Sequence, residues 1–271
     1  MSAAIQYYVM ILGKKEAWYK SNVRIVKPFM FLPFDQSSPP SALSSAGRIW
    51  KKEIAIKRGV LFGAAGKVEA EVVLPDVPSL PLFHPIPIYI RIKCYSKPLP
   101  HTESSDPSSF KFPLPPTATT GLDLKLCSHI RISAKGHVRE RPLDYASVAG
   151  LGKPEKKTQA GGWGQDVQVD VGQPTWVMEG ESKKMGRWFQ ESTFQAPMTL
   201  RCPPSFDRRT VRLEYTFELT VPFPGLGNNL TLSVGPVPVS SGIYRDQIER
   251  AAGELLDIPP TYWEVAELKE K

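Results

Sequence analysis

The sequence predicts an all-β protein built as an antiparallel β-sandwich. Apolar and polar residues alternate along several segments, Pro and Gly are frequent (27 and 20 of 271 residues), and only the last part of the chain shows helical spacing. Alternation with a period of two is the pattern of a strand with one buried and one solvated face. Many strands with turn residues between them, and few helices, are typical of a sandwich.

Seven segments show this alternation most clearly. They are residues 68–74, 86–92, 122–132, 167–171, 194–202, 211–221 and 230–239. Pro87 predicts that its segment is an edge strand or that the proline lies at a strand start. The alternation slips at Gly235-Pro236, where a bulge or bend is expected. Two further runs, 5–11 and 23–25, could pair as a hairpin, which by itself is marginal in water.

Irregular segments separate the expected strands. Residues 35–48 have the composition of a linker, 96–116 contain six prolines, and 144–164 contain five glycines and three lysines. Long loops of this kind are unusual unless they are functional or disordered. From Gly242 onward, apolar residues follow helical spacing as far as Leu255, and Pro259-Pro260 is expected to end this helix.

The charge balance narrows the choice of partners. Lys and Arg outnumber Asp and Glu by 34 to 27, a net charge of +7. This sign favours acidic partners such as phosphorylated tails or anionic lipid heads. Adjacent basic residues, such as Lys51-Lys52 and Arg208-Arg209, lack the interleaved aromatic residues of a base-stacking groove, so no nucleic acid is predicted as a partner. No stretch reaches the roughly 18 apolar residues that a membrane span needs, and we expect a cytosolic protein.

The sequence shows no catalytic or metal-binding pattern. Cys127 and His129 lie two apart on one strand face, but a metal site needs three or four such ligands, and no second pair has this spacing. No G-x-S-x-G hydrolase elbow is present. Gly150-Leu151-Gly152-Lys153 resembles a phosphate-binding loop, but the residue after Lys153 is a proline, whereas such a loop requires Ser or Thr there. We therefore predict a protein that is not an enzyme and that has no cofactor and no metal.

One short motif indicates recognition by a partner. Pro259-Pro260-Thr261-Tyr262 is a P-P-x-Y sequence. A proline pair biases the backbone toward polyproline II, so less entropy is lost when its rings stack in the aromatic groove of a WW-type domain. Tyr262 can fill a neighbouring pocket and is expected to carry most of the binding energy. The alternative is that Pro259-Pro260 only ends a helix while Tyr262 packs on the sandwich.

Two features together resemble one protein family. Residues 210–241, TVRLEYTFELTVPFPGLGNNLTLSVGPVPVSS, resemble the closing strands of an arrestin C-domain, and the P-P-x-Y that follows resembles the tail of α-arrestins, the arrestin-related trafficking adaptors. Residues 51–93 and 123–135 are similar to the opening and middle strands of that domain. The resemblance implies an immunoglobulin-like antiparallel β-sandwich of the arrestin C-domain type with a short C-terminal helix.

The resemblance also implies a division of the chain. Family members carry two such sandwiches, whereas this chain has room for one. The expected parts are N-terminal strands left from an arrestin N-domain (1–34), a linker (35–48), the C-domain-like sandwich (49–242), and a helix with the P-P-x-Y tail (243–271).

The function implied by the resemblance is that of an adaptor. Such proteins bind cytosolic tails of membrane transporters or receptors and recruit HECT-type ubiquitin ligases, whose WW domains bind P-P-x-Y. Ubiquitination and endocytosis of the cargo follow, in the cytoplasm at the plasma membrane or endosomes, where an anionic membrane surface is a further partner. Pro259, Pro260 and Tyr262 match the motif. A second hypothesis is a β-sandwich module that binds lipid or another ligand through basic loops, with Lys153, Lys156 and Lys157 as its cations.

Overall fold

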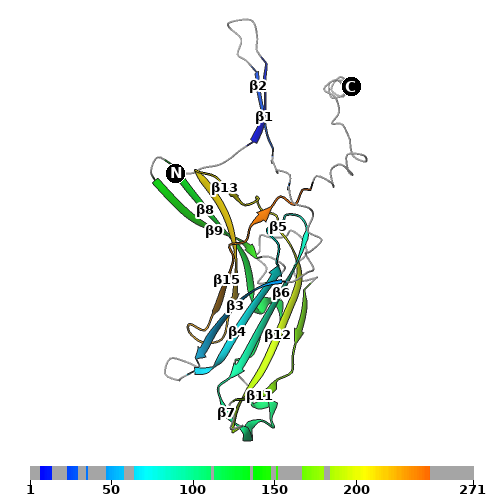
Figure 1. Cartoon of the computed structure of the whole chain (residues 1–271), viewed down its shortest axis with the longest axis vertical. Coiled ribbons are helices and arrows are strands. Elements are labelled where there is room, and N and C mark those ends of the chain that lie inside the picture. Colours follow the sequence, from blue (N-terminus) through cyan, green and yellow to red (C-terminus); the bar gives the residue numbers. More distant parts are fainter. Residues whose placement is uncertain are drawn as a thin grey trace, which may run out of the picture. The chain divides into compact units, whose positions relative to one another are not determined.

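The computed structural model describes residues 7–13, 23–29, 35, 47–57, 64–110, 113–134, 137–147, 151, 167–179 and 184–244 (Figure 1). These residues divide into two compact units. The larger unit lies within residues 40–240, and the smaller lies within 2–39 and 241–271.

The larger unit contains a first sheet of seven strands among the residues that the structure describes. Its main path is ordered β10 (Gln168–Val171), β12 (Met185–Thr199), β6 (Pro85–Ser96), β4 (Ala64–Pro75) and β3 (Gly47–Lys57). Two further strands, β11 (Thr175–Glu179) and β7 (Leu99–Pro100), also pair with β12. All the neighbouring pairs in this sheet are antiparallel.

A second antiparallel sheet belongs to the same unit. Its described strands are β13 (Phe206–Asp207), β14 (Val211–Val221), β8 (Asp123–Ala134) and β9 (His137–Ser147), with β15 (Leu230–Val234) also paired to β14. A short parallel pair joins β5 (Leu80–Pro81) to β16 (Val239–Ser240). The helical segments within the described ranges are three short 3₁₀ turns, η1 (His101–Glu103), η2 (Pro107–Ser109) and η3 (Thr119–Gly121).

The core is formed by the apolar faces of these strands. In β6 every second residue from Ile86 to Ser96 is buried, and in β14 the run from Leu213 to Val221 buries every second side chain. Tyr215 is fully buried, and its hydroxyl donates to the Pro203 carbonyl oxygen at 2.8 Å, so its polar end is satisfied. The alternation read from the sequence is therefore the alternation between core and surface, and the all-β antiparallel sandwich is confirmed.

Several local expectations can be compared with this fold. The edge position considered for Pro87 is wrong, because β6 pairs with both β4 and β12. The strand-start alternative is right: the β4 pairing ends at Tyr89, so Pro87 has a neighbour on the β12 side only. A missing N–H is tolerated at such a position. The expected break after β15 is also confirmed, because the strand stops at Val234 and the chain resumes pairing at Val239.

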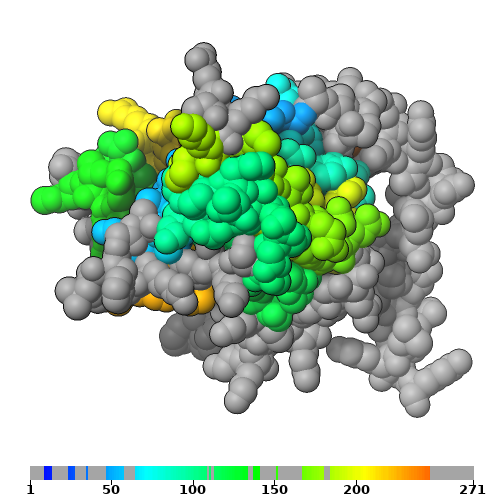
Figure 2. Space-filling view, turned by 90° about the horizontal axis from the view of Figure 1, so that it is seen from below, coloured from blue at the N-terminus to red at the C-terminus, as the bar shows by residue number. Residues whose placement is uncertain are grey.

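Other segments are more regular than expected. Residues 96–116, expected to be a long loop, contain β7, η1 and η2. The η1 segment is joined to the start of β12 by a hydrogen bond from the His101 N–H to the Lys184 carbonyl oxygen at 2.9 Å. In Figure 2 the blue-green surface of the segment around residue 100 lies beside the yellow-green surface of the segment around residue 185. β9 and β11 were not expected, and β3 begins inside the expected linker. The expected C-terminal helix and most of 144–164 lie outside the described residues.

The smaller unit contains a two-stranded antiparallel hairpin, as expected. It pairs β1 (Tyr7–Gly13) with β2 (Val23–Phe29). Val9, Ile11 and Ile25 are each more than half exposed. In the same unit, the Asp35 N–H donates to the Ile243 carbonyl oxygen at 2.8 Å.

Candidate partner-binding surfaces

The residues predicted to bind a ligase are not among those described. Pro259, Pro260 and Tyr262 lie beyond Tyr244, where the description of the chain ends, and Lys153, Lys156 and Lys157 lie in the gap between 151 and 167. The surfaces that can be built from side chains are therefore on the sandwich.

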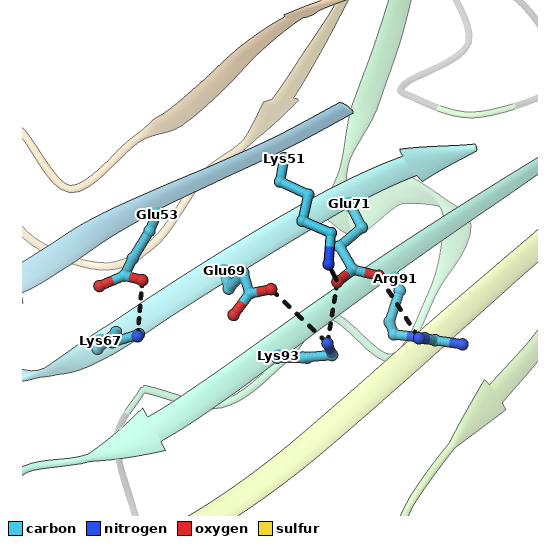
Figure 3. A network of polar contacts seen from close by, with 7 residues as sticks. All are labelled: Lys51, Glu53, Lys67, Glu69, Glu71, Arg91 and Lys93. Carbon is cyan, nitrogen blue, oxygen red and sulfur yellow. Dashed lines mark hydrogen bonds and ion pairs between the residues drawn. The ribbon is translucent and has the colours of Figure 1, made fainter. Parts of the chain in front are cut away.

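The outer face of the first sheet carries a band of charged side chains. On β4 and β6 the even-numbered residues face the core, as Ile54 and Ile56 of β3 do, so the odd-numbered residues form the opposite face. Figure 3 shows the seven residues concerned: Lys51, Glu53, Lys67, Glu69, Glu71, Arg91 and Lys93. The strand register aligns Lys51, Glu71 and Arg91 in one row across the sheet. The alternation thus places opposite charges side by side.

Glu71 is the centre of this band. It is only 4% exposed although it lies on the outer face, because three long cationic side chains surround it. Its carboxylate is 2.7 Å from Lys51 Nζ, 3.0 Å from Lys93 Nζ and 3.4 Å from Arg91 Nη1. Burial alone would raise the pKa of Glu71, but the hydrogen bonds from Lys51 and Lys93 outweigh it and lower the pKa from 4.5 to about 2. The carboxylate therefore stays ionised.

The remaining charges of the band are also paired. Lys93 Nζ is 3.6 Å from a Glu69 oxygen, and Lys67 Nζ is 2.6 Å from a Glu53 oxygen. Burial would lower the pKa of Lys93, but its hydrogen bond to Glu71 and the charges of Glu69 and Glu71 raise it. The band holds four cations and three carboxylates, so it joins three strands while carrying a net charge of only +1.

A pocket of about 460 Å³ lies at one end of this band. It is lined by Glu53, Ala55, Gly66, Lys67, Lys97, Pro98, Glu179 and Arg187. Its lining residues form two ion pairs, Lys67 with Glu53 and Arg187 with Glu179. Lys97 is a third cation in the lining. Such a mixed lining suits a polar segment of a partner, since it offers both hydrogen-bond donors and acceptors.

Aromatic side chains gather where β11 meets β12. Trp176 and Trp188 are opposite each other in the register, with ring centroids 5.4 Å apart and nearly perpendicular planes. Gly186 makes room for the first of them, because a Cβ at that position would lie 2.5 Å from the Trp176 ring. The cluster therefore fixes the β11 edge of the sheet by packing.

The cysteine and histidine residues form no metal cluster in the described part of the chain. Cys127 is buried and His129 is exposed, and His129 Nε2 lies 2.9 Å from Thr216 Oγ1. Among the described residues no three His, Cys, Asp or Glu side chains gather as metal ligands would. Burial raises the pKa of the Cys94 and Cys202 thiols, so both stay protonated at neutral pH.

Sequence reasoning missed the charged band and the pocket. Alternation correctly put Glu69 and Glu71 opposite the apolar face of their strand, but the burial of Glu71 depends on cations from two other strands. Only the register of the three strands shows that these cations surround Glu71.

Within the described ranges, no helix has the length and apolar character to cross a membrane. Comparison with protein-family models and with curated proteins finds no match to this chain.

Proposed function

We propose that this protein is an arrestin-like adaptor that recruits a WW-domain HECT-type ubiquitin ligase to membrane-protein cargo and so promotes ubiquitination and endocytosis of that cargo. The observation that carries the proposal is the combination of an antiparallel β-sandwich with a P-P-x-Y sequence beyond its last strand. The sandwich supplies a rigid scaffold, and Pro259, Pro260 and Tyr262 supply the ligase ligand.

In this proposal the cargo is the cytosolic tail of a transporter or receptor, and the adaptor works in the cytoplasm at the plasma membrane or endosomes. The net charge of +7 supports that location, since anionic lipid heads and phosphorylated tails attract a basic protein. The adaptor needs no catalytic group of its own, because the ligase performs the chemistry.

The strength of ligase binding follows from the size of the motif. A single short polyproline ligand buries little surface, and we expect a dissociation constant in the micromolar range. This corresponds to a binding free energy of about −8 kcal/mol. One motif also lacks the gain in avidity that tandem motifs provide.

The test measures binding of a purified WW domain to the intact protein by calorimetry. Tyr262→Ala should reduce binding below detection, because it removes the side chain that fills the second pocket. Thr261→Ala is the matched control, since the motif accepts any residue at that position, and it should bind like the parent. WW-domain binding that survives Tyr262→Ala contradicts the proposal.

A further inference from the structure

We propose that the free edge of β3 accepts an extended acidic segment of a partner protein as an additional strand. This interaction is separate from the P-P-x-Y motif. Among the described strands, β3 pairs only with β4, and its first seven residues are exposed apart from the half-buried Trp50.

The direction of the backbone groups follows from the register. The Lys97 N–H donates to the Ala65 carbonyl oxygen at 3.1 Å, so the odd-numbered residues of β4 direct their peptide groups toward β6. The even-numbered residues of β4 therefore face β3, where they pair with even-numbered residues. The N–H and C=O groups of Ile49, Lys51, Glu53 and Ala55 consequently point away from β4, toward the open side.

At the end of this edge, the side chain of Asn228 bonds the backbone of Lys57 as an added strand would. Asn228 is 2% exposed, and its side-chain amide accepts from the Lys57 N–H at 3.1 Å and donates to the Lys57 carbonyl oxygen at 2.7 Å. A carboxamide that bonds both groups of one residue reproduces what a neighbouring strand would offer. Lys57 is thus occupied from within the chain, and the four outward positions before it remain for a partner.

The side chains of this edge select an acidic strand. Arg48 and Lys52 are exposed cations, and Lys51, although paired with Glu71, keeps 55% of its side chain exposed. The strand itself carries one carboxylate, that of Glu53. The Arg48 guanidinium lies 5.2 Å from the centroid of the Trp50 ring, and an apolar side chain of a partner would pack beside this pair. A strand that alternates acidic and apolar residues complements both features.

The edge of β9 is less suited to this role. The Ser133 N–H donates to the Thr210 carbonyl oxygen, so odd-numbered β8 residues face β14 and even-numbered ones face β9. Pro142 is opposite His129 and therefore directs its backbone nitrogen outward, where proline has no N–H to offer. The outward positions of β3 contain no proline.

The experiment uses the full chain and a short fluorescent peptide in which Val alternates with Asp or Glu, without P-P-x-Y, and measures binding by fluorescence anisotropy. Two further peptides carry N-methyl groups on one or the other alternate set of residues. Strand addition predicts that methylation of only one set abolishes binding, because only that set donates to the β3 edge.

Protein variants locate the site. Ile49→Pro removes an outward N–H without touching the β4 ladder and should weaken binding about tenfold, as expected for one lost hydrogen bond. Lys52→Glu should weaken it through repulsion, whereas Lys125→Glu, an equal charge change on the second sheet, should leave it within about twofold. Circular dichroism verifies that each variant is folded.

Three results overturn the proposal. They are no binding of the peptide, equal binding of both methylated peptides (which indicates attraction by charge alone), and unchanged binding by folded Ile49→Pro and Lys52→Glu. Any of these means that the charges along β3 serve only to keep the edge from aggregating. Because the Tyr262→Ala variant should still bind the peptide, failure here is distinguishable from failure of ligase recruitment.

Discussion

A buried carboxylate on the solvent side of a sheet depends entirely on its neighbours. Glu71 lies within 3.4 Å of three cations, and removing its charge leaves these cations facing each other. We expect Glu71→Gln to lower the free energy of unfolding by about 2 kcal/mol, the scale of a lost charged hydrogen-bond network. Urea denaturation measures this. Glu53→Gln, whose side chain is 55% exposed, is the control and should change stability by less than about 1 kcal/mol.

The same residue makes stability depend on pH. The folded-state pKa of Glu71 is about 2, below the ordinary 4.5, so its stabilising effect is fully present above pH 4.5 and is lost as the pH falls toward 2. The stability difference between the parent and Glu71→Gln should therefore be constant near neutrality and shrink in this acid window. A difference that persists unchanged at pH 2 contradicts the assignment.

Asn228 is the second residue whose side chain joins distant parts of the chain. Besides Lys57, its amide donates to the Pro224 carbonyl oxygen at 2.6 Å. Asn228→Ala removes three hydrogen bonds to the backbone of Lys57 and Pro224 and should destabilise the protein by about 2–4 kcal/mol in thermal or urea unfolding. The adjacent Asn229 is exposed, and Asn229→Ala should be nearly neutral. Equal effects of the two substitutions would disprove the role of the amide.

At the scale of elements, β11 is fixed to β12 by close packing. Gly186→Ala forces a Cβ toward the Trp176 ring, and we expect a loss of about 1–3 kcal/mol together with a changed near-ultraviolet circular dichroism signal. Gly172→Ala is the control, because its added Cβ would meet its nearest atom at 3.5 Å, an ordinary contact. An unchanged tryptophan signal in Gly186→Ala would rule out the packing argument.

The elements also show why the sequence predicts some strands and not others. β14 has one fully buried face, so alternation marks it from Val211 to Val221. In β9 the residues 137–140 are all exposed, so their sequence shows no alternation of apolar and polar residues by which to recognise a strand. In β11 the adjacent Val177 and Met178 are 42% and 49% exposed, so apolar residues lie on both faces of the strand. The charged band could be assigned to a solvent face, but its ion pairs depend on the register of three strands.

For the whole molecule, the two proposed interactions differ in their response to salt. Docking of P-P-x-Y in an aromatic groove is mainly apolar, whereas an acidic strand on β3 is attracted by exposed cations. Raising the ionic strength should leave WW-domain binding nearly unchanged and weaken peptide binding severalfold, as two parallel anisotropy titrations would measure. Similar salt dependence of both would mean that one of them is misassigned.

The bond between Asp35 and Ile243 has a topological consequence. Every strand of both sheets lies between these two residues in the sequence, and yet the two residues touch. Residues 36–242, which contain both sheets, therefore form a loop in the topological sense, and a backbone hydrogen bond joins the two residues that flank it.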